Sequence, residues 1–152
     1  MNLVTGGPGF VGSHIVRALL ARGQPVRCLV RPGSRRTNLD GLPVEVAVGD
    51  LTDPPSLREA VRGCRVVYHC AADYRLGARR PDAIYASNVA GTDNLLRAAA
   101  DAAVERVVHT SSVGALGRRP DGRPADENTP VRPESLIGDY KKSKYEGECV
   151  AR

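Results

Sequence analysis

Residues 2–12 read NLVTGGPGFVG, and this stretch decides the architecture that the rest of the chain can adopt. NLVT is a short β-branched run that predicts a strand, and glycines follow at positions 6, 9 and 12. Apolar residues then recur at helical spacing and predict a helix over Phe10–Ala21. Gly6 permits a tight turn, Gly9 lets a phosphate approach the backbone, and Gly12 allows helix and strand to pack closely. The pattern predicts a pyrophosphate-binding turn at a helix N-terminus, although a merely glycine-rich turn is the alternative.

Four further β-branched runs follow, separated by helical patterns or turns. The five predicted strands are residues 2–5, 26–31, 44–49, 65–70 and 105–110. The predicted helices are residues 10–21, 54–61, 82–102 and a last one from about Gly138 to the end. Near-continuous apolar strands are typical of a parallel sheet covered on both faces. The sequence therefore predicts an α/β fold, a Rossmann-type doubly wound parallel sheet with strand order 3-2-1-4-5.

The end of the second predicted strand carries positive charge. In the NAD form of this fold, an acid about 20 residues after the glycines binds the ribose 2′-OH. Here that place holds Arg31, followed by Arg35 and Arg36, and the first acidic residue of the chain is Asp40. An arginine pairs with a 2′-phosphate, whereas an acid would repel it. We therefore predict NADP(H) as the preferred cofactor and NAD(H) as the alternative, unless these arginines only cover a solvated surface.

A tyrosine and a lysine stand four residues apart in the last predicted helix. Tyr140 and Lys144 in DYKKSK project from the same helical face. An ammonium beside a phenol favours the phenolate, which acid/base catalysis by tyrosine requires. Ser112 follows the fifth strand, where open α/β sheets place their active sites, and could orient a substrate oxygen. A lone Y-x-x-x-K also occurs on solvated helix faces, but its position behind T-S-S and a glycine turn favours catalysis.

Composition excludes several classes of function. The formal net charge is +5, but residues 1–39 hold six arginines and no acid, and the remaining basic and acidic residues nearly cancel. With one Phe and no Trp, the chain has few stacking platforms, so we expect no nucleic-acid partner. No stretch approaches the ~18–20 apolar residues of a membrane span, and no signal peptide is visible. The four cysteines form no C-x-x-C pair and the three histidines are scattered, so we expect reduced thiols, no metal site and a cytoplasmic location.

Residues 113–137 hold four prolines and three glycines and predict a long loop of functional importance. The chain stops at Arg152, inside the helix that carries Tyr140. We therefore expect residues 1–152 to form an NAD(P)-binding domain that is incomplete at its C-terminus and lacks the last strands and a C-terminal substrate-binding region. On this interpretation the chain alone has negligible turnover and marginal stability.

These motifs together resemble the extended short-chain dehydrogenase/reductase family, the NAD(P)-dependent epimerase/dehydratase group, over the whole chain. TGGPGFVG, residues 5–12, resembles the cofactor loop of that family and adds Phe10 and Val11 to the cofactor-binding residues. GDLTD, residues 49–53, resembles its adenine-contacting segment, which assigns Asp50 and Leu51 to the same cofactor.

The resemblance also assigns residues in the second half of the chain. HCAAD resembles the end of the fourth strand, so Ala71 and Ala72 would line the cofactor. SNVAGT matches a helix segment whose asparagine, here Asn88, helps to order the active site. Within TSS, Ser112 occupies the place of the catalytic serine or threonine of the family, and Ser111 would face the cofactor.

Within the family, LVRPGSRRTNL, AADYRLGAR and DGRPADENTP…IGDYKKSK are most like hopanoid-associated sugar epimerases, and also similar to dihydroflavonol 4-reductase-like proteins. One departure is ALG at 115–117, where sugar-nucleotide enzymes have V-Y-G. The resemblance implies an oxidoreductase or epimerase that exchanges hydride between a nicotinamide and a sugar-like alcohol or ketone, with Tyr140 as acid/base. A dihydroflavonol 4-reductase-like ketone reductase and a non-catalytic NADP-binding module or fragment are the alternatives. The expected partner is a small-molecule substrate, and a homodimer is an arrangement open to the full-length protein.

Overall fold

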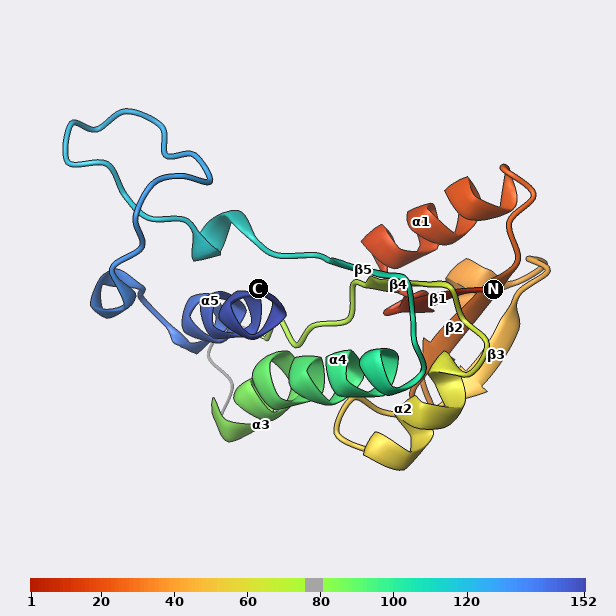
Figure 1. Cartoon of the computed structure of the whole chain (residues 1–152). Helices are drawn as coiled ribbons and strands as arrows, with labels where there is room; N and C mark the ends of the chain where they lie inside the picture. Colours follow the sequence, from red (N-terminus) through yellow and green to blue (C-terminus); the bar gives the residue numbers. More distant parts are fainter. Residues whose placement is uncertain (76–80) are drawn as a thin grey trace.

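The computed structural model describes residues 1–75 and 81–152, so positions 76–79 of the AADYRLGAR motif lie outside the described residues. Five parallel strands form one sheet in the order β3-β2-β1-β4-β5 (Figure 1). The strands are β1 (Asn2–Thr5), β2 (Val26–Val30), β3 (Glu45–Val48), β4 (Val66–His69) and β5 (Arg106–His109). The predicted fold and strand order are confirmed.

Helices cover both faces of this sheet (Figure 1). They are α1 (Phe10–Leu20) on one face, and α2 (Pro54–Val61) and α4 (Gly91–Asp101) on the other. Adjacent residues of β1 point to opposite faces. Val4 packs in one core with Val16 of α1, whereas Leu3 packs in the other with Leu57 of α2 and Leu95 of α4. All four residues of β1 are buried because helices cover the sheet on both faces.

The predicted helix over 82–102 was wrong in one detail. The structure has α3 (Pro81–Tyr85), then a π-helical turn, η2 (Ala86–Ala90), and only then α4. Next to this wide turn, the Thr92 hydroxyl donates a hydrogen bond to the carbonyl oxygen of Asn88 at 2.7 Å. Hydrophobic periodicity does not report such a local change of helix type.

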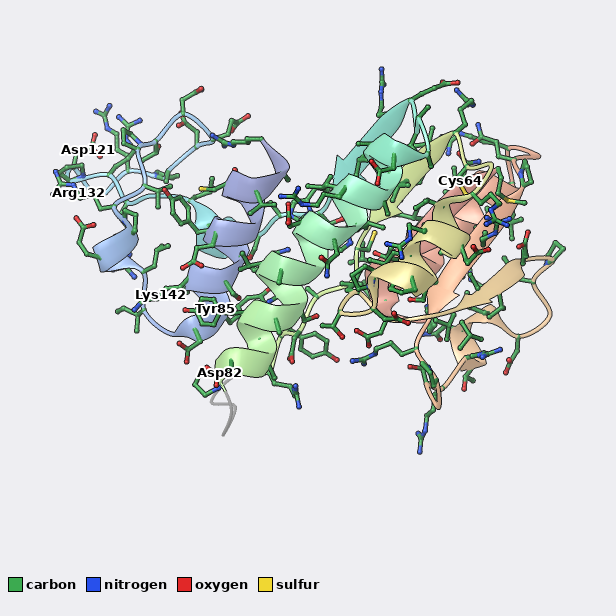
Figure 2. All side chains as sticks on the ribbon, turned by 60° about the horizontal axis from the view of Figure 1, so that its bottom comes forward. Cys64, Asp82, Tyr85, Asp121, Arg132 and Lys142 are labelled. Atoms are coloured by element: carbon green, nitrogen blue, oxygen red, sulfur yellow. The ribbon has the colours of Figure 1, made fainter. Side chains whose placement is uncertain are left out.

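The last helix, α5 (Asp139–Ala151), packs against η2 and α4. The long loop before it contains two short 3₁₀ turns, η3 (Val113–Ala115) and η4 (Pro133–Ser135). A third 3₁₀ turn, η1 (Thr37–Leu39), lies in the loop after β2. Most of the long loop projects away from the sheet (Figure 1), and Figure 2 shows Asp121 and Arg132 on this projection. Tyr85, by contrast, lies where α3 meets α5, with its hydroxyl 3.5 Å from the Asp139 carboxylate (Figure 2).

The register of the parallel strands aligns their C-terminal ends. Thr5 of β1 pairs with Leu29 of β2 on one side and with His69 of β4 on the other, and His69 pairs with His109 of β5. The loops that follow the strands therefore leave the sheet at one edge, where open α/β sheets bind ligands. Among the described residues, no helix combines the length and apolar character needed to cross a bilayer.

Candidate functional site

The glycine turn connects β1 to α1 with very little space. Gly6 adopts a positive φ of 70°, and a Cβ there would lie 2.8 Å from the backbone nitrogen of Ala71. A Cβ at Gly12 would overlap the carbonyl oxygen of Gly6. The Gly9 N–H donates to that same oxygen at 2.9 Å, and Gly9 is the N-cap residue of α1. The turn thus presents the first N–H groups of α1, which lack intrahelical partners, to an incoming anion.

A cleft of about 650 Å³ opens beside this turn at the C-terminal edge of the sheet. It brings together predicted cofactor residues from four separate segments, namely Gly6, Gly9, Arg31, Asp50, Leu51, Ala71 and Ala72. The other predicted cofactor residues, Phe10, Val11, Gly12, Ser111, Tyr140 and Lys144, are not among those that line it. The side chains of Phe10 and Val11, the first two residues of α1, are exposed to solvent.

Asp50 is held rigidly in the wall of the cleft. Its carboxylate accepts hydrogen bonds from the N–H of Thr52 at 2.8 Å and from the Thr52 hydroxyl at 2.7 Å. Its own N–H donates to the Ser56 hydroxyl at 3.1 Å. One carboxylate oxygen, Oδ1, accepts both Thr52 bonds, so Asp50 retains capacity to accept from a ligand.

The segment after β2 supplies the positive side of the cleft. β2 ends at Val30, so Arg31 begins the loop, and Arg31, Ser34 and Arg35 line the cleft together. This loop is tied to the glycine turn, because the Asn38 side-chain amide donates to the Pro8 carbonyl oxygen at 2.8 Å. Sequence reasoning missed both Ser34 and Asn38. The position of Ser34, three residues after Arg31 in the same loop, could have indicated that it lines the cleft with Arg31.

The segment after β4 also lines the cleft and carries an ion pair. The Arg75 guanidinium donates to the Asp73 carboxylate from Nε at 3.0 Å and from Nη2 at 2.5 Å. These hydrogen bonds hold the pKa of Asp73 below its ordinary value, and the more distant charge of Arg31 acts in the same direction. Asp73 is therefore ionised and already neutralised by protein, so its charge is not free to repel an anion.

The backbone of Asp73 also connects the cleft to α5. Asn88 is buried; its side-chain oxygen accepts from the Asp73 N–H at 2.7 Å, and its amide donates to the Asp73 carbonyl at 2.9 Å. The same amide donates to the Ser143 hydroxyl at 3.0 Å, and Ser143 in turn donates to the Tyr140 carbonyl oxygen at 2.9 Å. Asn88 is thus a predicted residue that the structure places between the cleft wall and the helix of Tyr140 and Lys144. Ser143 was not predicted.

Lys144 is almost fully buried in α5. Its ammonium donates to the carbonyl oxygen of Thr110, after β5, at 2.7 Å. Burial lowers the pKa of Lys144, and the nearby carboxylate of Glu148 opposes that shift. Tyr140 lies one turn earlier on α5 and is half-buried. The structure therefore fixes the lysine at the end of β5 and leaves the tyrosine side chain partly accessible.

The two adjacent serines differ in their hydrogen bonds. Both line a second hollow of about 670 Å³ with His109 and Glu148, and neither lines the cleft. The Ser111 hydroxyl donates its hydrogen to the Glu148 carboxylate. The Ser112 oxygen instead accepts from the Gly114 N–H at 3.1 Å, which leaves its hydrogen free to donate. Within residues 1–75 and 81–152, no three His, Cys, Asp or Glu side chains are grouped closely enough to hold a metal ion.

A parallel sheet of this order with a glycine turn at its central strand defines a dinucleotide-binding α/β domain. Residues 2–152 match the NAD dependent epimerase/dehydratase family, and the chain belongs to that family. It is 50% identical over 148 residues to a Synechocystis protein provisionally named dihydroflavonol 4-reductase, covering 97% of this chain and 43% of that protein.

Two solved structures show the same fold. The crystal structure of gox2253 superposes with a TM-score of 0.93 at 50% identity, covering 99% of this chain and 46% of that one. The UDP-glucose 4-epimerase of Thermus thermophilus, in complex with NAD, superposes with a TM-score of 0.83 at 34% identity, covering 99% of this chain and 49% of the epimerase. The chain thus spans less than half the length of each of these similar proteins.

Proposed function

We propose that residues 1–152 form the NADP(H)-binding domain of an oxidoreductase or epimerase that acts on a sugar-like alcohol or ketone. The observation that supports this proposal is that Arg31, Ser34 and Arg35 line the same cleft as the glycine turn. Two guanidinium groups and a hydroxyl at the end of β2 match the charge and hydrogen-bonding capacity of a 2′-phosphate.

The remaining lining fits the rest of a dinucleotide. Gly9 and the start of α1 offer backbone N–H groups to a pyrophosphate, and no side chain at Gly9 obstructs its approach. Asp50 supplies an acceptor for an adenine amino group. Ala71 and Ala72 are small enough to let a ribose lie against the end of β4. When bound, the nicotinamide supplies or accepts the hydride.

The chain's own residues would move the proton. Tyr140 exchanges a proton with the substrate oxygen at its phenol, while Lys144, fixed on the Thr110 carbonyl, remains a cation beside it. Ser112 donates its free hydrogen to the same substrate oxygen. Ser111 has already committed its hydrogen to Glu148, and this supports Ser112 as the substrate-orienting serine. In the proposal, Ser111 contributes to the cofactor side through its oxygen.

The cofactor preference can be tested by fluorescence titration with NADPH and NADH. We expect tighter binding of NADPH, and we expect Arg31→Ala to weaken NADPH by about tenfold or more while leaving NADH nearly unchanged. Arg36→Ala is the matched control, because it removes the same charge from an exposed residue that does not line the cleft. Equal affinities in the unaltered chain, or a preference for NADH, would refute the proposed preference.

A second candidate activity is net reduction of a ketone, favoured by the 50% identity to the Synechocystis protein. The same groups serve both reactions, since a reductase and an epimerase each need a proton donor beside the hydride. The two differ in stoichiometry. A reductase consumes NADPH with each turnover and lowers the absorbance at 340 nm, whereas an epimerase returns the hydride to its substrate.

A further inference from the structure

His69 is a buried ionisable residue that the proposed proton transfer does not use. It ends β4, is 1% exposed, and lies in the last row of the sheet between Thr5 and His109. Its Nδ1 lies 2.7 Å from the Thr5 hydroxyl and its Nε2 lies 3.1 Å from the Thr92 hydroxyl. Both ring nitrogens therefore have hydrogen-bond partners in the core, so breaking either bond would leave a buried polar atom unsatisfied.

The surrounding hydrogen bonds determine where its proton lies. The Thr92 hydroxyl has one hydrogen, which it donates to the Asn88 carbonyl at 2.7 Å, so it must accept from His69. Nε2 of His69 therefore carries a hydrogen. Burial, together with the neighbouring His109 and Lys144, lowers the pKa of His69 to about 3, so the ring is neutral near pH 7. A neutral ring has only one N–H, and Nδ1 must accept from Thr5.

The Thr5 oxygen is then free to accept, and it receives two backbone N–H groups. These are the amides of Ala71 at 3.1 Å and Cys70 at 3.2 Å, both in the wall of the cleft. On this side, the orientation of His69 determines the direction of the Thr5 hydroxyl and so holds the start of the loop after β4. If Nδ1 carried the hydrogen, the Thr5 oxygen would face three donors and its own hydrogen would have no partner at the imidazole.

The Thr92 side leads to α5. The Thr92 hydroxyl bonds to the carbonyl of Asn88 in the π-helical turn, where Gly147 of α5 approaches so closely that a Cβ would overlap that oxygen. The Asn88 side chain then bonds to Asp73 and Ser143, and Ser143 bonds to the backbone of Tyr140. A series of buried and partly buried hydrogen bonds therefore joins the cleft wall, through His69, to the helix of the proposed acid/base.

We propose that His69 is a positioning residue whose neutral Nε2–H form sets both the cleft wall at Ala71 and, through Thr92, the Asn88 turn that supports α5. Only the consequence for cofactor affinity rests on the proposed function. The protonation form and its effect on Asn88 are properties of the folded chain itself.

Nuclear magnetic resonance of the ¹⁵N-histidine-labelled chain tests the first half of the proposal. We expect His69 to give the signals of a neutral ring protonated at Nε2 at pH 7. A ring protonated at Nδ1, or a charged ring at that pH, would overturn the proposal. This measurement requires no ligand, so it remains decisive even if the chain binds no dinucleotide.

Substitutions at Thr92 test the second half. Thr92→Val keeps the shape and removes the hydroxyl, whereas Thr92→Ser keeps the hydroxyl and is the matched control. We expect Val to shift the side-chain amide signals of Asn88 and to weaken NADPH binding by roughly threefold to tenfold, and Ser to restore both. His69→Gln, which retains a donor near Nε2, should also restore the Asn88 signals that His69→Phe perturbs.

The outcomes separate this inference from the proposed function. A folded Thr92→Val chain with unchanged Asn88 signals refutes the positioning role, and so do shifted Asn88 signals that Ser does not restore. Failure of the unaltered chain to bind NADPH or NADH refutes the proposed function, and the Asn88 signals then decide the positioning role alone. If His69→Phe does not fold, the comparison of Thr92→Val with Thr92→Ser tests the positioning role without it.

Discussion

The glycine turn and α5 contribute to the same proposed site, yet different forces hold them in place. At the turn, backbone atoms approach so closely that Gly6 and Gly12 leave no room for a side chain. The helix that follows, α1, buries Val16 and Leu19 against the sheet. In α5 the buried residues are Ser143, Lys144 and Gly147, two of them polar, and hydrogen bonds to other segments satisfy those two.

This difference indicates how each region should fail. A region limited by shape is damaged by added atoms and is insensitive to pH. A region held by buried hydrogen bonds is damaged when a donor or acceptor is removed or when a proton is added. The cleft requires both regions, because Asp73 lies in its wall and bonds to Asn88, which reaches α5.

The largest effect should come from adding one methyl group to the glycine turn. In Gly12→Ala the new Cβ would overlap the Gly6 carbonyl oxygen, which is backbone and cannot rotate away. We expect a loss of about 3 kcal/mol in the free energy of unfolding, measured by urea denaturation, together with loss of dinucleotide binding. Gly23→Ala is the control, because Gly23 has a positive φ but nothing within 4 Å of a Cβ. It should cost only about 1–2 kcal/mol, and equal losses for the two variants would argue against the steric explanation.

A smaller effect should come from pH, and it should arise in the hydrogen-bonded region. The pKa of His69 is about 3 in the folded chain, against an ordinary value of 6.5. Between these values the unfolded chain binds a proton that the folded chain does not bind, so stability falls as pH decreases below 6.5. We expect His69 to account for a loss of about 2 kcal/mol between pH 7 and pH 5, measured by urea denaturation at each pH.

Burial also lowers the pKa of His109, so some pH dependence should remain when His69 is replaced. His69→Gln is the informative variant, since it removes the titrating group and keeps a donor near Thr92. Its stability should depend less steeply on pH than that of the unaltered chain. Identical slopes would place the pH sensitivity elsewhere.

The smallest effect should come from removing one hydroxyl from α5. In Ser143→Ala, Asn88 keeps its bonds to Asp73 but loses the one that reaches α5. We expect a loss of about 1 kcal/mol in the free energy of unfolding. Ser135→Ala is a close control, because the Ser135 hydroxyl makes the same type of bond to the carbonyl three residues earlier, but at an exposed position. A Ser143 variant no less stable than the Ser135 variant would contradict the hydrogen-bonded description of α5.

Much of the fold and part of the site could be predicted before any coordinates. The strand order follows from apolar runs separated by helical patterns, and it is confirmed. The grouping of Gly6, Arg31 and Asp50 in one cleft follows from the meeting of strand ends at one edge of a parallel sheet. The π-helical turn at 86–90 was not predicted, because hydrophobic periodicity does not distinguish it from an α-helix; in the structure, the Thr92 hydroxyl and Gly147 both lie against the Asn88 carbonyl of this turn.

Three polar residues whose contacts sequence reasoning missed share one property. Asn38 bonds to a residue 30 positions away, Ser143 to one 55 positions away, and His69 to one 64 positions away. No local pattern marks them, because a polar side chain in a strand or helix has no spacing rule that names its partner. The distinction between Ser111 and Ser112 is of the same kind, since it depends on Glu148 from α5.

The amino-acid sequence by itself determined the class of fold, the glycine turn and the positive charge after β2. These depend on backbone freedom, hydrophobic periodicity and residue type, all of which are local. Only the tertiary structure decided which hydroxyl retains a free hydrogen, which nitrogen of His69 carries the proton, and how Asn88 joins the cleft to α5. Hydrogen-bond direction depends on every neighbour of an atom at once, and those neighbours come from strands and helices far apart in the chain.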